Sequence, residues 1–355
     1  WLKRASPLTM HASISSEVSF KPGLMEYRFS FSLASILVLL LHVAMTNSQN
    51  HIDTDNFNML QIKIDNSHVH GEDGATLDNC KKEILSDEEC ERAGAVFYSF
   101  VNRTRSEVLK WPVSPAMPNA TNRVALTVFQ PASEVDAFAY AIRWNMRMLG
   151  PKWALQVFYA TEEDRRVLDQ ALGNPSFLIW TPIKVKGESV SKLDKWTFNW
   201  WWLSKDVWEP INHEHILFFE TDSMIIRNDG CVEKFLTYDY VGAPWPYGEG
   251  GNGGLSLHRR SSAMPAILSD DASRMMTSEG AYRDLLLADV AMVQLLQGVH
   301  SFIAPREEEQ RFSVEIIDHP APCGFHKRWL ARCDSETDVA DVMRGYMFQA
   351  QQAML

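Results

Sequence analysis

Short apolar runs alternate with helical segments through the middle of this chain, and that alternation restricts the fold more than any other feature. Apolar runs of strand length occupy residues 123–129, 154–159 and 177–180. Residues 134–149 carry apolar side chains at helical spacing, and Thr161, followed by two glutamates, is typical of the start of a second helix. Strands that alternate with helices of this length predict β-α-β units and a mostly parallel, Rossmann-like sheet flanked by helices.

Two carboxylates follow another apolar run, at residues 216–219. An uninterrupted run of this kind is typical of a central strand covered on both faces. Because side chains alternate along a strand, Glu220 and Asp222 are predicted to point to the same side. Such a pair can hold Mn²⁺ or Mg²⁺ against the diphosphate of a nucleotide, which is expected at this end of parallel strands. Solvated acids at a strand end are the alternative.

Residues 29–45 form an uncharged apolar run that begins after Arg28 and ends before a polar segment. The run is close to the shortest length that spans a bilayer, and its basic flank favours a single-pass type II signal anchor with the following residues in the lumen. A cleaved signal peptide, which would make the protein secreted, and a buried core helix are the alternatives. Residues 1–28 are then expected to be a cytosolic or mispredicted leader.

Residues 46–122 are predicted to form a stem, because they are polar and charged and because three prolines close the segment. Two glycosylation sequons in it begin at Asn102 and Asn119 and fit a lumenal chain. The folded domain is expected over residues 123–334. Residues 335–355 are expected to form a helical tail.

Composition narrows the function classes. A formal net charge of -11 argues against a nucleic-acid partner, since phosphate binding draws on clustered Lys and Arg. Five cysteines fit an oxidising compartment, and their spacing favours the local pairs Cys80–Cys90 and Cys323–Cys333 with Cys231 left free. No Cys-x-x-Cys or Cys/His spacing indicates a zinc site.

An aromatic segment, residues 189–207, is predicted to be helical. At helical spacing its buried face would hold Trp196, Trp200, Leu203 and Val207. A packed core explains these side chains better than a platform on which sugars stack.

Glycines at positions 250, 251, 253 and 254 precede the apolar run Leu255–Leu257. Glycine lets a backbone approach a ligand closely or adopt a positive φ, which a sugar-binding loop beside a diphosphate requires. A plain tight turn into the following strand is the alternative.

Four motifs in order make the pattern specific: Glu220–Asp222 (ETD), Tyr238–Trp245 (YDYVGAPW), Gly251–Leu257 (GNGGLSL) and Gly324–Lys327 (GFHK). They occur in this order in a family known only as a domain of unknown function, and the sequence resembles a branch of the GT-A glycosyltransferases. The resemblance spans roughly residues 123–330. It implies an α/β fold of the GT-A type, after an N-terminal hydrophobic segment and stem.

The resemblance implies a metal centre and a donor site. Glu220, Asp222 and His326 would ligate Mn²⁺ or Mg²⁺, and the imidazole favours Mn²⁺. Asp222 is the firmer carboxylate ligand, because the family more often has Gln at the position of Glu220. Lys327 or Arg259 could meet the departing phosphates, and a solvated surface cation is the alternative for each. The donor pocket would be shaped by Gly251, Asn252, Gly253 and Gly254.

The resemblance implies that Asp289 is the catalytic base, in a helix expected at residues 285–296, where it would take a proton from the acceptor hydroxyl. The family has an acidic pair here, and Ala288 replaces the first acid, which puts acceptor positioning, or activity itself, in question. A catalytically inactive GT-A-fold protein that binds a nucleotide sugar or a carbohydrate is therefore the alternative function. His213 and His215 are interpreted as loop residues.

These expectations combine into a metal-dependent, hexosyltransferase-like glycosyltransferase of the Golgi or a neighbouring compartment. It would move a sugar from a nucleotide-sugar donor to a hydroxyl group of a glycan or glycoprotein acceptor. A membrane would be a partner only through residues 29–45, if that segment is not cleaved.

Overall fold

The computed structural model describes residues 83–84, 87–245, 250–272, 288–327, 331–332 and 338–354. All of them belong to one compact unit, residues 71–355. The apolar segment at residues 29–45, its leader and about half of the expected stem lie outside the described residues. Among the helices that are described, none is long and apolar enough to cross a membrane.

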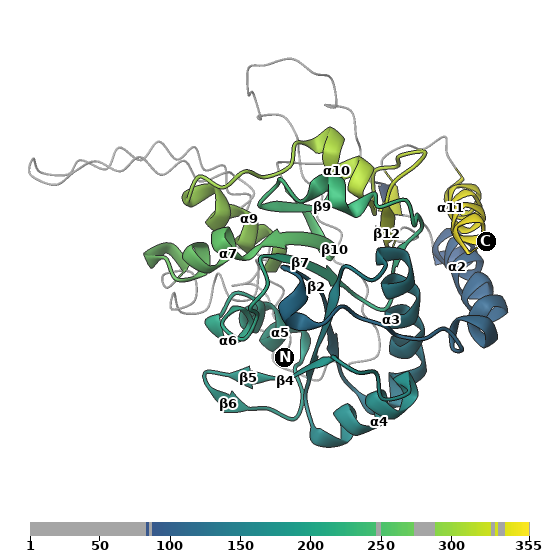
Figure 1. The fold of residues 1–355 in the computed structure, drawn as a ribbon. Coiled ribbons are helices and arrows are strands. Elements are labelled where there is room, and N and C mark those ends of the chain that lie inside the picture. Colours follow the sequence, from purple (N-terminus) through teal and green to yellow (C-terminus); the bar gives the residue numbers. More distant parts are fainter. Residues whose placement is uncertain are drawn as a thin grey trace, which may run out of the picture. The chain divides into compact units, whose positions relative to one another are not determined.

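A six-stranded sheet forms the centre of this unit (Figure 1). Its first four strands run parallel, whereas β10 runs antiparallel to both of its neighbours. In register, Val124 of β2 lies between Ala154 of β3 and Ile216 of β7. The prediction of a mixed α/β fold with a mostly parallel central sheet is confirmed. The spatial order is β4 (Ile179–Pro182), β3 (Ala154–Tyr159), β2 (Arg123–Phe129), β7 (His215–Phe219), β10 (Gly251–Arg259) and β9 (Tyr240–Pro244).

Within the described residues, three smaller sheets accompany the central one. A three-stranded sheet has the order β11 (Ser313–Val314), β12 (Gly324–His326) and β8 (Ser223–Ile225). The two-stranded pairs are β1 (Glu83–Ile84) with β13 (Ala331–Arg332), and β5 (Lys184–Val185) with β6 (Glu188–Ser189).

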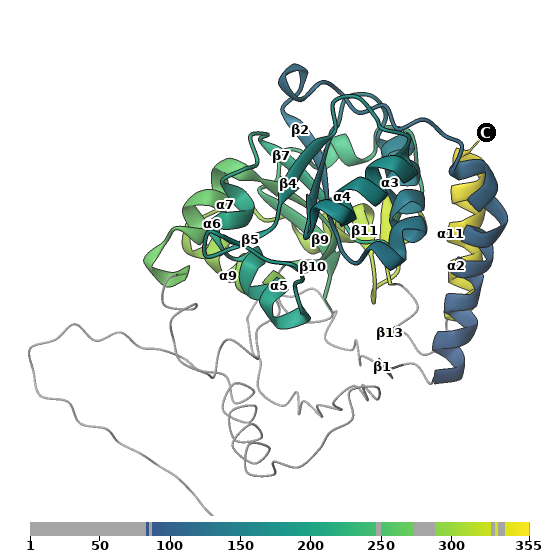
Figure 2. The same ribbon diagram turned by 90° about the horizontal axis from the view of Figure 1, so that it is seen from below.

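Helices cover both faces of the central sheet (Figure 2). Alternation along β7 explains this: Leu217 and Phe219 are buried in the core shared with α2, α3 and α11, whereas Ile216 and Phe218 are buried in the core shared with α5, α6, α7 and α9. The α-helices are α2 (Asp87–Val108), α3 (Val135–Leu149), α4 (Glu162–Leu172), α5 (Lys195–Trp202), α6 (Lys205–Trp208), α7 (Arg260–Ile267), α9 (Ala288–Gly298), α10 (Arg306–Phe312) and α11 (Val339–Ala353). Short 3-10 helices are η1 (Pro118–Ala120), η2 (Ala132–Glu134) and η3 (Val232–Phe235).

Local sequence signals account for helices α3 and α4, which follow strands β2 and β3. In α3, Phe138, Ile142 and Met146 are buried as their helical spacing predicts. Thr161 caps α4: its hydroxyl accepts from the Asp164 amide, and the Asp164 carboxylate accepts from the Thr161 amide in return. Strands β2, β3 and β7 follow the predicted apolar runs. Strand β4 begins two residues later than predicted, because Phe177 has a φ of 69° and is 52% exposed.

Helix α2 does not belong to a stem. Its side chains Phe97 and Phe100 are buried against α3 and α11, and α2 and α11 lie side by side in both views (Figures 1 and 2). The folded unit therefore includes residues that we assigned to the stem at 46–122. The expected tail at 335–355 is helical at α11, as predicted, but it packs on the core.

The aromatic segment forms two short helices instead of one. Helix α5 ends at Trp202, and the Ser204 hydroxyl donates to the Trp201 carbonyl at the break. Leu203 and Val207 of the predicted face are buried, together with Trp201, Trp202 and Trp208, whereas Trp200 of that face is only half-buried. The prediction that the segment packs in the core is confirmed.

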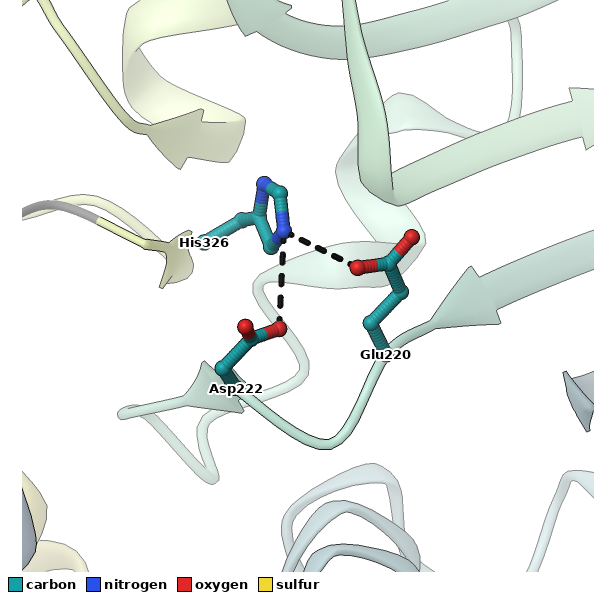
Figure 3. A group of neighbouring side chains, drawn as sticks. All are labelled: Glu220, Asp222 and His326. Carbon is teal, nitrogen blue, oxygen red and sulfur yellow. Dashed lines mark hydrogen bonds and ion pairs between the residues drawn. The ribbon is translucent and has the colours of Figure 1, made fainter. Parts of the chain in front are cut away.

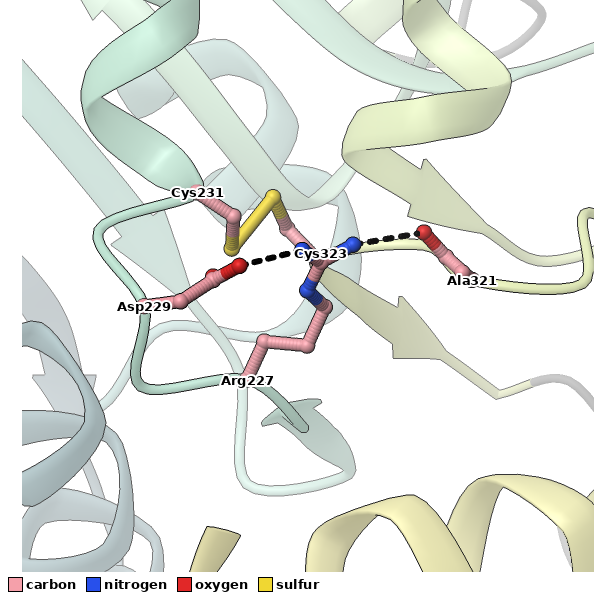
Figure 4. Close-up of a disulfide and its surroundings, with 5 residues drawn as sticks. All are labelled: Arg227, Asp229, Cys231, Ala321 and Cys323. Atoms are coloured by element: carbon pink, nitrogen blue, oxygen red, sulfur yellow. Dashed lines mark hydrogen bonds and ion pairs between the residues drawn. A yellow bond between two sulfur atoms is a disulfide. The ribbon is translucent and has the colours of Figure 1, made fainter.

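The cysteine pairing also differs from the prediction. Cys231, before η3, forms a disulfide with Cys323, before β12 (Figure 4). Beside it, Arg227 pairs with Asp229 and donates to the Ala321 carbonyl. The predicted Cys323–Cys333 pair and a free Cys231 are therefore wrong, because the fold brings together residues 92 positions apart. Cys80 lies outside the described residues, so its pairing with Cys90 stays a prediction.

Candidate metal centre

A tight turn between β7 and β8 carries the two predicted carboxylates. Glu220 leaves the sheet after Phe219, and its amide donates to the Gly254 carbonyl at 2.9 Å. The chain then turns through Asp222 into β8, where the Ser223 amide donates back to the Glu220 carbonyl at 3.1 Å. The two side chains converge across this turn, and not through alternation along one strand as we predicted.

Helix α3 holds this turn in place through the buried side-chain amide of Asn145. Asn145 accepts from the Ile225 amide at 2.9 Å and donates to the Ser223 carbonyl at 3.2 Å. The Trp144 indole donates to the Ile225 carbonyl at 2.7 Å. Because these bonds satisfy the backbone of β8, the turn that precedes it has a defined position.

Strand β12 brings the third predicted ligand from about a hundred residues away. It pairs antiparallel with β8, and the register places His326 opposite Ser223. The His326 Nε2 atom lies 3.3 Å from Glu220 Oε2 and 3.5 Å from Asp222 Oδ1 (Figure 3). One ligand atom from each of the three residues falls within 4.8 Å of the others. The described residues therefore contain a group that could hold one metal ion.

The chemistry of these side chains fits a divalent cation. Asp222 Oδ1 and His326 Nδ1 are both buried without a hydrogen-bond partner among the described residues. Buried polar atoms are normally satisfied, so a carboxylate oxygen that only faces an imidazole nitrogen at 3.5 Å can still accept a cation. Two carboxylates and one imidazole suit Mn²⁺ better than Mg²⁺, which prefers oxygen ligands alone.

Lys327 lies against the same carboxylates. Its Nζ atom is 3.0 Å from Glu220 Oε2 and 3.3 Å from Asp222 Oδ2. Desolvation by the surrounding protein would lower the pKa of Lys327, but the charges of Glu220 and Asp222 outweigh it and raise that pKa. In this arrangement the ammonium group neutralises the predicted ligands instead of facing open solvent.

The three charges of the centre shift one another strongly. Desolvation alone would raise the pKa of Glu220, but its hydrogen bond and ion pair with His326 and the charge of Lys327 lower it to about 2. Burial alone would lower the pKa of His326, yet its bonds to Asp222 and Glu220 raise it to about 10. The Glu220 carboxylate is therefore ionised across the neutral pH range, and a cation that binds Nε2 of His326 must displace a proton from it.

Asp289, the predicted base, lies in the first turn of α9 and reaches toward this centre. It accepts a hydrogen bond from the Gly253 amide. Desolvation and the nearby charge of Glu220 raise the pKa of Asp289 to about 6. A carboxylate with this pKa can accept a proton near neutral pH. Of the predicted helix at 285–296, the structure describes the part from Ala288 onward.

The predicted glycine-rich loop is the first half of β10, which corrects the expectation of a loop that leaves space for a ligand. A Cβ atom at Gly251 would lie 2.2 Å from the Ala243 carbonyl oxygen, and one at Gly253 would lie 2.1 Å from Asp289 Oδ1. Asn252 accepts from the Gly254 amide at 2.7 Å, so its side chain shapes the strand. Gly250, the first of the four glycines, has a φ of 79°, as the prediction of a positive φ allowed, whereas Gly251, Gly253 and Gly254 make room for other parts of the protein.

Glu315 is a site residue that our reading of the sequence missed. It follows β11 directly and points one carboxylate oxygen at His326, with Oε1 3.6 Å from Nδ1. Burial raises the pKa of Glu315 to about 7, and the charge of His326 opposes the shift. The sequence carried only a weak signal, because Glu315 follows the short segment Phe312–Val314, which a serine interrupts, whereas Glu220 follows an uninterrupted apolar run.

Other candidate residues lie at the opposite end of the sheet. Arg259, at the far end of β10, pairs with Asp239 at 3.2 Å, so the suggestion that it meets phosphates is wrong. His215 belongs to β7 rather than to a loop, and it lies opposite Arg259. His213 is a buried loop residue whose Nε2 lies 3.0 Å from the Pro118 carbonyl oxygen.

Two cavities flank the metal centre. One of about 520 Å³ is lined by Asp222 and Thr221 together with Tyr98 of α2 and Tyr140 of α3. The other, of about 210 Å³, is lined by Glu220 and by the ends of β2 and β7, with Phe198 of α5 beside them. Glu220 and Asp222 therefore each face space that a ligand can enter.

Comparisons with known proteins give one family model that matches part of the chain and several distantly similar solved structures. A family model described as "Protein of unknown function (DUF5672)" matches residues 192–326. Comparison with curated proteins finds no match. Similar solved structures include the glycosyltransferase GlyE from Streptococcus pneumoniae TIGR4, at 11% identity and a TM-score of 0.37, and its apo form at 11% identity and 0.39. Another is the mannosyltransferase PcManGT from Pyrobaculum calidifontis, in complex with GDP-Man and Mn²⁺, at 13% identity and 0.34.

These similarities cover part of each protein. Both GlyE matches cover 66% of this chain and 63% of the GlyE chain, and the PcManGT match covers 61% of this chain and 66% of that one. The chain thus spans slightly less than two thirds of the length of the structures that it resembles.

Proposed function

We propose that this protein is a glycosyltransferase that uses a divalent cation to transfer a sugar from a nucleotide-sugar donor to a hydroxyl group of a glycan or glycoprotein. One observation carries the proposal: Glu220, Asp222 and His326 converge where β7, an inner parallel strand, leaves the sheet. Ligands of open α/β sheets bind at this end of the strands.

The proposed cation ligands are Glu220, Asp222 and His326. Mn²⁺ or Mg²⁺ bound there would neutralise the diphosphate as it leaves the sugar. Lys327 supports the same role, because its ammonium group lies within 3.3 Å of both carboxylates and can pair with a phosphate oxygen at that place. With a cation bound, the centre would therefore carry positive charge where a leaving diphosphate needs it.

Asp289 is the proposed catalytic base. Its carboxylate is held by the Gly253 amide, and its pKa of about 6 leaves it ionised at neutral pH. It would take the proton of the acceptor hydroxyl as that oxygen attacks the anomeric carbon. We propose that Gly251, Asn252, Gly253 and Gly254 act in donor binding chiefly by shaping the strand, in which Gly253 and Gly254 leave room for Asp289 and His326.

The charges of the two cavities favour different substrates. Asp222, Glu134 and Asp136 line the larger cavity, where Arg105 is already paired with Asp136. An acidic wall repels a diphosphate but accepts hydrogen bonds from sugar hydroxyl groups. We therefore assign the larger cavity to the neutral acceptor and the smaller, more apolar cavity beside Glu220 to the nucleoside of the donor.

We also propose a lumenal location. The Cys231–Cys323 disulfide suits an oxidising compartment. The sequon residues Asn102 and Asn119 both lie exposed on the surface. Under this proposal residues 29–45 anchor the protein in a Golgi or other secretory-pathway membrane, residues 46–82 form the remaining stem, and the catalytic unit extends from there through α11.

Donor turnover tests the function directly. The purified protein is incubated with a panel of uridine- and guanosine-diphosphate sugars and Mn²⁺, and release of nucleoside diphosphate is measured with and without EDTA. We expect Mn²⁺-dependent release from at least one donor and its loss in Asp222→Ala. The exposed acid Asp341, on α11, provides the control variant Asp341→Ala. Release that persists in Asp222→Ala would refute the assignment of the ligands.

Ala288 stands where the family that the sequence resembles has an acid. This difference motivates one alternative, a protein that binds a nucleotide sugar or carbohydrate without turnover. Calorimetric titration separates the two. Donor binding without hydrolysis or transfer, over a broad acceptor panel, would favour the binding protein over the enzyme.

A further inference from the structure

His326 is held between carboxylates on two edges of its ring. Nε2 faces Glu220 and Asp222, at 3.3 and 3.5 Å. Nδ1 faces Glu315, at 3.6 Å from Oε1. Because the two ring nitrogens lie on different edges, Glu315 does not belong to the group around Nε2.

Glu315 and His326 share a buried environment. The His326 side chain is 4% exposed and the Glu315 side chain 12%. Nδ1 of His326 has no hydrogen-bond partner among the described residues. Among the same residues, Glu315 forms an ion pair with His326. The separation exceeds a direct hydrogen bond by a few tenths of an ångström, which a small rotation of either side chain closes.

The backbone holds the two residues at this spacing. Strand β11 runs parallel to β12, and the register pairs Val314 with Phe325. Glu315 and His326 therefore each follow a paired residue on neighbouring strands. Gly254 presses on the other side of the imidazole, where a Cβ atom would lie 2.4 Å from Nε2. The ring has little freedom to turn away from Glu315.

We infer that Glu315 is a positioning residue of the proposed cation site, which holds the protonated Nδ1 of His326 and thereby keeps the Nε2 lone pair directed at the space between Glu220 and Asp222. A histidine that ligates a metal commonly donates its other N–H to a carboxylate, which fixes the tautomer and makes the ligating nitrogen more basic. Glu315 does not ligate the cation itself. This inference rests on the proposed function, because it assumes that His326 binds a cation.

Two substitutions separate positioning from a structural role. Glu315→Gln keeps an oxygen acceptor of the same size without the charge, whereas Glu315→Leu removes the acceptor and keeps the approximate volume. Glu309→Gln is the control, because Glu309 is also a buried acid near β11. The ion pairs of His326 are with Glu220, Asp222 and Glu315, so the control changes a buried acid without changing one of these pairs. Each purified protein is titrated with Mn²⁺, and free Mn²⁺ is measured by electron paramagnetic resonance. The thermal midpoint and near-ultraviolet circular dichroism of each variant report folding.

The expected result is a graded loss of affinity. Removing such a partner weakens metal binding by about 10- to 100-fold, so we expect a loss of that size in Glu315→Leu, a smaller loss in Glu315→Gln and none in Glu309→Gln. The visible spectrum of bound Co²⁺ should also change in Glu315→Leu, because the ring orientation sets the ligand field. If Glu315→Leu does not fold, the loss in the isosteric Glu315→Gln decides the question.

Failure of the inference differs from failure of the proposed function. If the wild-type protein binds Mn²⁺ and folded Glu315 variants bind it equally well with an unchanged Co²⁺ spectrum, Glu315 has no positioning role and the cation site stands. If the wild-type protein binds no Mn²⁺, the cation site is refuted and the role of Glu315 with it.

Discussion

Gly254 of β10 lies directly against the imidazole of His326. A Cβ atom at position 254 would fall 2.4 Å from Cε1 and Nε2 of the ring, closer than any real van der Waals contact. Gly254 thus sets the position of His326, a proposed metal ligand 72 residues further along the chain. This contact gives the geometry of the centre a steric cause that can be tested by a single methyl group.

The substitution Gly254→Ala should displace His326 and weaken cation binding. We expect Mn²⁺ affinity to fall at least tenfold, and the overpacked site to lose about 1–3 kcal/mol of unfolding free energy. Mn²⁺ titration and urea unfolding measure the two effects. Gly345→Ala is the control, because Gly345 is exposed in α11 with no atom within 4 Å of the added methyl group, and helix propensity should make it more stable by about 0.5–1 kcal/mol. Unchanged Mn²⁺ affinity in Gly254→Ala would contradict the steric account.

Protonation of Asp289 should slow the transfer reaction at low pH. Desolvation and the charge of Glu220 raise its pKa to about 6, and a base works only when deprotonated. At saturating Mn²⁺, kcat/KM should rise tenfold per pH unit below about 6 and level off above it. Asp289→Asn should lower kcat by about 10²- to 10⁴-fold without loss of donor binding. Full activity in this variant, with the same pH profile, would assign the proton transfer to another group.

The fold was predictable where local patterns decide it. Apolar runs located β2, β3 and β7, and Thr161 located the start of α4. The acids after β7 and the histidine at 326 identified the three side chains that converge. These signals are short in sequence and depend on neighbours that are buried or capped in any context.

The remaining features depend on contacts between distant segments. The Cys231–Cys323 pair and the contact of Glu315 with His326 arise from strand pairing that local spacing does not encode. Helix α2 was assigned to a stem because its composition is polar, although Ala93, Phe97, Phe100, Thr104 and Val108 form a buried stripe at helical spacing. The glycines of β10 were interpreted as space for a ligand, but the fold fills that space with Asp289 and His326.

The disulfide should stabilise the strand that carries His326. Cys323 immediately precedes β12, and the bond closes a loop of 92 residues, for which the loss of chain entropy in the unfolded state is worth about 4–5 kcal/mol. Cys231→Ser with Cys323→Ser should therefore lower the unfolding free energy by about 2–5 kcal/mol. Guanidinium unfolding of this double variant and of reduced wild-type protein should give the same lowered midpoint. A midpoint equal to that of oxidised wild-type protein would show that the bond does not stabilise the fold.

His258 should make the protein less stable in acid. It is buried among Trp202, Trp208 and Tyr240, with Nε2 2.8 Å from the Ser256 hydroxyl oxygen, and burial lowers its pKa from 6.5 to about 3. The unfolded chain therefore binds a proton below pH 6.5 that the folded chain does not bind, so stability is lost as the pH falls from 6.5 toward 3, by up to about 1.4 kcal/mol per pH unit.

A non-titrating substitution isolates this contribution. In His258→Gln the slope of unfolding free energy against pH, measured with urea between pH 6.5 and 4, should be smaller by about one proton. The exposed residue His300 provides the control His300→Asn, in which the slope should stay at the wild-type value. An unchanged slope in His258→Gln would mean that His258 is protonated in the folded protein.

The account depends most on one cation bound jointly by Glu220, Asp222 and His326, and equilibrium Mn²⁺ binding tests that claim most directly. Electron paramagnetic resonance of free Mn²⁺ should show one site per wild-type chain. Asp222→Asn, which keeps the shape of the side chain and removes its charge, should weaken that site by about tenfold or more, because carboxylate charge sets the affinity for hard cations. Asp341→Asn, on the surface of α11, should bind as the wild type does. No Mn²⁺ bound to the wild-type protein, or equal affinity in Asp222→Asn, would contradict the proposed centre.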